Sequence, residues 1–115
     1  MRKLFFSIAY FQIHKKMTRH IVMFKFRADV SEEQRKSARE AFKQGIEHLP
    51  EVIPFIRKVF VGFNINDNEK WDICLDSTFD NLDDAKAYGA HPAHKQVAME
   101  LMKHIAERAC VDFEE

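Results

Sequence analysis

Hydrophobic and polar positions alternate along three stretches of the chain, and each alternation predicts a β-strand. The first strand is expected at residues 20–26, where Val22, Phe24 and Phe26 fall on one face. The second is expected at 56–63. The third, at 71–79, has the cleanest period of two, which indicates one buried face and one face toward solvent or a partner. A short last strand is expected at 109–113.

Apolar residues spaced three and four apart predict helices between these strands. The first helix follows a Ser-x-x-Gln capping box at residues 31–34 and ends at Pro50. Its apolar stripe consists of Ala38, Phe42, Gly45, Ile46 and Leu49. A short helix is expected at 82–88, ended by Gly89, because glycine commonly follows the last helical turn. A final helix, with proline in its first turn, is expected from His91 through Ala109.

The resulting order, β-α-β-β-α-β, predicts an α+β fold of the ferredoxin-like type. In that fold two helical segments cover one face of a four-stranded antiparallel sheet. The other face cannot be entirely polar here, because its positions include Ile21, Met23 and Phe60. Exposed apolar patches of that kind usually mark an interface. We therefore expect two sheets to meet face to face in a homodimer, which forms a dimeric α/β barrel.

Composition supports one globular domain and removes some classes of partner. The chain has 115 residues, of which 46% are hydrophobic and 31% charged. Eighteen basic and 18 acidic residues give a formal charge of zero, so nucleic acid, which selects clustered positive charge, is not an expected partner. The two cysteines, Cys74 and Cys110, form no CxxC motif and are expected to be free thiols in half-buried or core positions.

Residues 1–16 combine a charged start with a short apolar run. That run is too short to span a bilayer, and no small-x-small cleavage site follows it. We interpret 1–16 as an N-terminal extension that is not part of the domain, which would cover 17–115. A weak export signal is the alternative. The preferred interpretation implies a cytoplasmic protein without membrane association.

Three segments resemble the stress-responsive A/B barrel domain family: HIVMFKF at 20–26, AYGAHPAH at 87–94 and CVDFE at 110–114. The resemblance extends from about Thr18 to Glu114 and implies a dimeric α+β barrel. A relative in the wider family, olivetolic acid cyclase, closes a linear tetraketide by a metal-free intramolecular aldol condensation. Its pocket residues are a histidine in the first strand, a tyrosine before the HPAH segment and the second histidine of that segment. The matching positions here are His20, Tyr88 and His94.

Each of these residues has a chemical and a structural interpretation. His94 lies in the first turn of the last helix, where the helix dipole disfavours imidazolium, so a neutral His94 could act as a general base. It could equally be a packed histidine, whereas His91 is expected to cap the helix. His20 could be catalytic or a hydrogen-bonded core residue. Tyr88 could orient a carbonyl or anchor the loop before Gly89.

No cofactor or metal site is expected. The histidines form no HExxH motif, and no cysteine lies near His91 and His94 in the sequence. A Mg²⁺ ion at the dimer edge is the alternative left open. The sequence also contains no phosphate-binding Gly-rich loop and no nucleophilic Ser or Cys motif.

Three classes of function are consistent with these observations. The first is a homodimer with an apolar interior pocket that binds a small apolar molecule. The second is a cofactor-independent enzyme, polyketide cyclase-like or monooxygenase-like, that uses His94, Tyr88 and His20. The third is a structural or interaction module. The sequence ranks the first slightly above the second and leaves open whether the protein is an enzyme.

Overall fold

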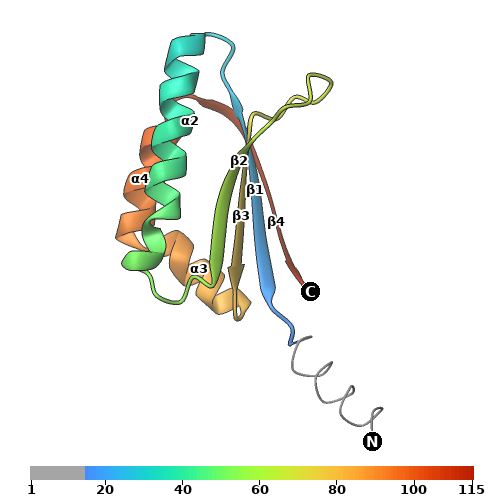
Figure 1. Ribbon diagram of the computed structural model, residues 1–115, viewed down its shortest axis with the longest axis vertical. Helices are drawn as coiled ribbons and strands as arrows, with labels where there is room; N and C mark the ends of the chain where they lie inside the picture. Colours follow the sequence, from blue (N-terminus) through green and yellow to red (C-terminus); the bar gives the residue numbers. More distant parts are fainter. Residues whose placement is uncertain (1–14) are drawn as a thin grey trace, which may run out of the picture.

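The computed structural model describes residues 15–115 and shows one sheet with helices on a single face (Figure 1). Its elements are β1 (Thr18–Phe26), α2 (Glu32–Glu47), a 3₁₀ turn η1 (Leu49–Glu51), β2 (Lys58–Phe63), β3 (Ile73–Phe79), α3 (Leu82–Ala90), α4 (Pro92–Met102) and β4 (Ile105–Glu114). None of these helices is long and apolar enough to cross a membrane. Residues 1–14, most of the predicted extension, lie outside the described residues.

The sheet is antiparallel, with strand order β2-β3-β1-β4, which confirms the predicted ferredoxin-like α+β fold. The first strand therefore lies in the middle, between β3 and the last strand. In this register His20 is opposite Ser77 on β3 and Asp112 on β4. The β1–β4 pairing thus brings the two ends of the domain together and places polar residues of β4 beside His20.

The core lies between the sheet and the helices. Val22, Phe24 and Phe26 point into it from β1, and Phe42 and Ile46 from α2, as their spacing predicted. The predicted capping box also forms, because Ser31 and Gln34 each accept a hydrogen bond from the other's backbone N–H. The core therefore follows directly from the hydrophobic pattern.

Helices α2 and α4 approach closely at Gly45. A Cβ atom built on Gly45 would lie 2.8 Å from Val97 Cγ1, closer than packed atoms tolerate. Glycine is required at this position for packing and not for its backbone angles, since it has no positive φ. The two helices can therefore cover the sheet side by side (Figure 1).

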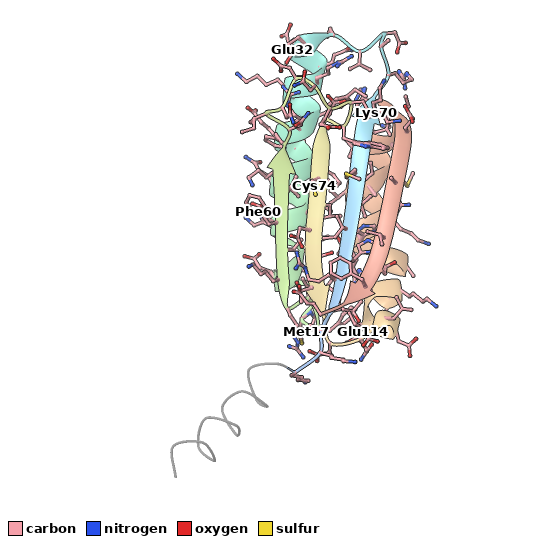
Figure 2. All side chains as sticks on the ribbon, turned by 90° about the vertical axis from the view of Figure 1, so that its right-hand side faces the viewer. Met17, Glu32, Phe60, Lys70, Cys74 and Glu114 are labelled. Carbon is pink, nitrogen blue, oxygen red and sulfur yellow. The ribbon has the colours of Figure 1, made fainter. Side chains whose placement is uncertain are left out.

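The opposite face of the sheet carries no helix (Figure 2). We call it the open face; its apolar members are Ile21, Met23, Phe60, Ala109, Val111 and Phe113. Phe60 is 55% exposed, Val111 54% and Phe113 41%. The expected apolar second face is therefore present, and it is uncovered in the single chain.

The boundary between the last helix and the last strand differs from the prediction. Helix α4 ends at Met102, and residues 105–109, expected to be helical, form the first half of a ten-residue strand. Leu101 and Ile105 are four apart and imitate a helical stripe. The backbone of this segment instead pairs with β1, from Phe26 opposite Ile105 onward. Tertiary pairing thus outweighs the local pattern.

Smaller differences concern element ends and one cysteine. Gly89 does not end the short helix, which continues to Ala90 and is followed by His91 in extended conformation. Strands β2 and β3 each begin two residues later than predicted, and Pro50 lies inside η1 directly after α2. Cys74 is half-buried as expected, but Cys110 is exposed because β4 is an edge strand; both thiols are free.

Candidate functional site

The three residues singled out in the sequence lie together at the end of the sheet where β1 begins and α3 packs (Figure 1). His20 comes from β1, Tyr88 from the last turn of α3 and His94 from the first turn of α4. The ring centroids of Tyr88 and His94 are 4.3 Å apart, and those of His20 and Tyr88 are 6.2 Å apart. The fold therefore gathers all three into one cluster.

His91 positions Tyr88 and His94 relative to each other. Its backbone N–H donates to the Tyr88 carbonyl at 3.1 Å, which closes α3. Its Nδ1 accepts a hydrogen bond from the Ala93 backbone N–H at 3.1 Å, which caps α4, as the sequence indicated. The following proline begins α4, so the break between the two helices spans a single residue. This sharp junction turns His94 toward Tyr88.

Tyr88 is completely buried, against Phe79 at a centroid distance of 5.1 Å. Its Oη has no hydrogen-bond partner among residues 15–115. Burial raises the pKa of Tyr88 well above its usual value, so the phenol stays neutral and keeps its proton. The site thus contains a hydroxyl donor, shielded from water, that the described protein does not use.

His94 carries the second buried polar atom without a partner among the described residues. Its Nδ1 is buried and makes no hydrogen bond within the described part of the chain. Burial lowers the pKa of His94, the charges of His20, Arg108 and His91 lower it further, and the Gly89 backbone acts in the opposite direction. The expected neutral imidazole is therefore supported, with burial as its largest cause.

His20 is paired with an acid that the sequence analysis did not identify. Its Nδ1 donates to Asp112 Oδ1 at 2.6 Å, and the side chains are 14% and 35% exposed, respectively. Because a carboxylate only accepts, Nδ1 carries the hydrogen of this bond. The signal for Asp112 is its place on the last strand of a ferredoxin-like fold, but the register that pairs it with His20 cannot be read from the sequence.

Cys110 joins this pair from the same strand. Its Sγ lies 3.6 Å from His20 Nδ1 and 3.9 Å from Asp112 Oδ2. Burial of the sulfur atom and the nearby Asp112 charge raise the pKa of the Cys110 thiol. The sequence argument against a metal considered cysteines near His91 and His94 only. The fold instead brings a cysteine beside His20.

The hollows elsewhere in the described structure include two that are lined mainly by apolar surface. One, of about 460 Å³, is a groove between α2 and α4 that includes Ala38, Phe42, Val97 and Leu101. The other, of about 540 Å³, lies at the open face and includes Met23, Trp71 and Cys74. Neither of these two hollows is lined by the three clustered site residues, whose rings pack against one another.

A comparison with protein families finds one match for the chain. The model described as the stress-responsive A/B barrel domain covers residues 18–115, which is nearly everything that the structure describes. A search of the curated proteins finds no match.

Solved structures resemble the chain along most of its length. A dimeric protein of unknown function with a ferredoxin-like fold, from Bacteroides fragilis NCTC 9343, is 47% identical, with a TM-score of 0.84 over 86% of this chain and 96% of that one. A dimeric ferredoxin-like protein of unknown function from Thermobifida fusca is 24% identical, with a TM-score of 0.70 over 85% and 90%. A hydroxynitrile lyase from Passiflora edulis is 15% identical, with a TM-score of 0.68 over 88% and 94%. The last two likenesses show the fold alone.

Proposed function

The chain belongs to the stress-responsive A/B barrel domain family, and we propose that it acts as a homodimer that binds a small molecule at His20, Tyr88 and His94. The observation that carries this proposal is a pair of buried polar atoms, Tyr88 Oη and His94 Nδ1, without partners among the described residues. Buried polar groups are almost always hydrogen-bonded, and exceptions call for an explanation. A ligand that binds both atoms supplies one.

The open face supports the homodimer. Its exposed side chains Phe60, Val111 and Phe113 come from both edge strands of the sheet, so the apolar surface extends across its full width. A 47% identical relative is itself dimeric. Two sheets packed face to face would remove this surface from water, and a stable interface of this kind buries at least about 1,000 Å².

The chemistry of the site limits the ligand. A neutral tyrosine hydroxyl donates a hydrogen bond, and a neutral imidazole donates through one nitrogen and accepts through the other. The surrounding rings of Phe79, Tyr88 and His94 are aromatic. We therefore propose a small, mostly apolar ligand whose carbonyl or hydroxyl oxygen binds Tyr88 Oη and His94 Nδ1. Leaving either buried group unsatisfied costs about 1–3 kcal/mol, which such a ligand would offset.

The test of this proposal is a thermal-shift screen with small aromatic ketones and phenols, accompanied by native mass spectrometry of the purified protein. Compounds that bind should raise the Tm of the wild type and of His48→Ala, a variant of an exposed histidine at the end of α2. They should not raise the Tm of Tyr88→Phe or His94→Ala. Equal shifts in all four proteins would place binding elsewhere, for example in the groove between α2 and α4.

A cofactor-independent enzyme is the second candidate, and the His20–Asp112 pair favours it. The hydrogen bond to Asp112 orients the His20 ring, while burial keeps His94 neutral and able to accept a proton. With a carbonyl ligand, Tyr88 would donate to the carbonyl oxygen and His94 would remove a proton from the adjacent carbon. The resulting enolate could then attack a second carbonyl of the same molecule, as in an aldol closure. Turnover of diketone or polyketide-like compounds, measured by mass spectrometry, tests this candidate.

We propose the cytoplasm as the compartment of this protein. Its two cysteines are both free, and one of them is exposed, which suits a reducing environment. Localisation of a C-terminally tagged copy by microscopy tests this, and a signal outside the cytoplasm would favour the export alternative.

A further inference from the structure

We propose that His20, Cys110 and Asp112 form a binding site for a divalent transition-metal ion, Zn²⁺ in particular. Their candidate ligand atoms, a ring nitrogen, a thiol sulfur and a carboxylate oxygen, all lie within 4.8 Å of one another. This inference goes beyond the small-molecule site, because it concerns the β4 side of His20 and requires neither Tyr88 nor His94.

The sheet register creates the cluster. Asp112 is the Cα partner of His20, and Cys110 is the partner of Val22, the next residue on the same face of β1. Residues two apart on a strand point to the same side, so Cys110 and Asp112 both point to the side of the sheet that holds His20. One ligand residue of β4 therefore lies directly opposite His20, and the other lies diagonally across from it, all on paired strands.

The distances suit a tetrahedral ion. With bonds of about 2.0 Å to nitrogen or oxygen and about 2.3 Å to sulfur, ligand atoms of Zn²⁺ lie about 3.3–3.6 Å apart. Cys110 Sγ is 3.6 Å from His20 Nδ1 and 3.9 Å from Asp112 Oδ2. The 2.6 Å separation of His20 Nδ1 and Asp112 Oδ1 is shorter because a proton joins these atoms. A metal ion at Nδ1 would take the place of that proton, and the neutral ring would then carry its hydrogen on Nε2. A rotation of the exposed Asp112 carboxylate would provide the additional space.

The set of donors selects the metal. Thiolate and imidazole ligands favour Zn²⁺ over Mg²⁺, which prefers oxygen ligands. Three protein ligands also leave a fourth position for water or a substrate atom, as in catalytic zinc sites. Cys110 and Asp112 are exposed, so an ion can reach them from solvent. Arg108, on the same face of β4, is the nearby charge that opposes a cation.

The test is a titration of the reduced full-length protein with Co²⁺, followed by displacement with Zn²⁺. Wild type should bind one ion per chain and show a thiolate-to-cobalt charge-transfer band in the near ultraviolet. Cys110→Ser should lose that band, whereas Cys74→Ser, a control at the other cysteine, should keep it. Asp112→Asn should keep the band but bind about tenfold more weakly or worse. Zn²⁺ should raise the Tm of wild type and Cys74→Ser and leave that of Cys110→Ser unchanged.

Three outcomes would overturn the metal site: no band in wild type, a band that persists in Cys110→Ser, or a band lost in Cys74→Ser. These outcomes are separate from the small-molecule proposal. Aromatic ketones and phenols should still stabilise metal-free Cys110→Ser, because Tyr88 and His94 are intact in that variant. Loss of the metal site alone would therefore leave the proposed function standing.

Discussion

His20 and Asp112 lie 92 residues apart in the sequence and are hydrogen-bonded across β1 and β4, with 2.6 Å between Nδ1 and Oδ1. The contact fixes the orientation of a histidine that lies 6.2 Å, between ring centroids, from Tyr88. It also shows how this fold builds its site. The central strand and the last strand present polar residues to each other, and the junction between α3 and α4 supplies the remaining rings.

Tyr88→Phe should stabilise the ligand-free protein. The variant removes a buried hydroxyl without a partner among the described residues and keeps the ring that packs on Phe79. Because the variant no longer buries an unsatisfied hydroxyl, its free energy of unfolding should be higher by about 1 kcal/mol. Urea denaturation of both proteins measures this difference. A loss of stability would mean that the hydroxyl has a partner in the folded protein, and the argument for a ligand would lose its main support.

His94→Ala should abolish catalysis if the site performs carbonyl chemistry. Loss of a positioned base lowers kcat by about two to four orders of magnitude, whereas Tyr88→Phe should have a smaller effect. His48→Ala is the matched control and should keep full activity. The fold and dimer mass of each variant are checked by circular dichroism and ultracentrifugation. Undiminished turnover by folded His94→Ala would exclude His94 as the base.

The stability of the protein should fall below about pH 6.5, the ordinary pKa of histidine. Burial lowers the pKa of His94 in the folded state, so the unfolded chain binds the proton more tightly. The stabilisation is therefore complete above the unfolded pKa and is lost as the pH falls toward the lowered folded pKa. Urea denaturation of wild type and His94→Gln across pH 5–8 isolates this contribution. A difference between the two proteins that does not change with pH would contradict the assigned direction.

Phe60→Asp and Met23→Asp should dissociate the homodimer. Each places a charge on the open face, in the interface that we propose. Ile65→Asp is the control, because Ile65 is 97% exposed in the loop after β2. Analytical ultracentrifugation at micromolar concentration should give the dimer mass for wild type and Ile65→Asp and a smaller mass for the other two. A monomer mass for the wild type would contradict the proposed homodimer.

Gly45→Ala should destabilise the fold through the contact between α2 and α4. The added methyl group would meet Val97, and overpacking of this kind costs about 1–3 kcal/mol, more than the gain in helix propensity. Gly89→Ala is a matched helical control, because its Cβ meets nothing within 4 Å, so it should be neutral or stabilising. Thermal denaturation compares the two. Recovery of Gly45→Ala by a second change, Val97→Ala, would confirm the contact.

Hydrophobic periodicity was sufficient to predict the core, because Val22, Phe24 and Phe26 alternate on a strand whose two faces differ. It was not sufficient at the end of α4, where Leu101 and Ile105 continue a helical spacing across the start of β4. The resemblance to a known family singled out His20, Tyr88 and His94. The sequence did not predict that Asp112 and Cys110 lie beside His20. Their position there depends on strand register, which the local sequence does not encode.

The most direct test of the central claim is isothermal titration calorimetry of the best-binding ketone or phenol against wild type, Tyr88→Phe and His48→Ala. The proposed site predicts tight binding to wild type and His48→Ala. Tyr88→Phe should bind about 10- to 100-fold more weakly, which corresponds to one lost hydrogen bond in a buried site. Equal affinity for all three proteins, or no binding by any ketone or phenol in the set, would contradict the claim that Tyr88 and His94 hold a ligand.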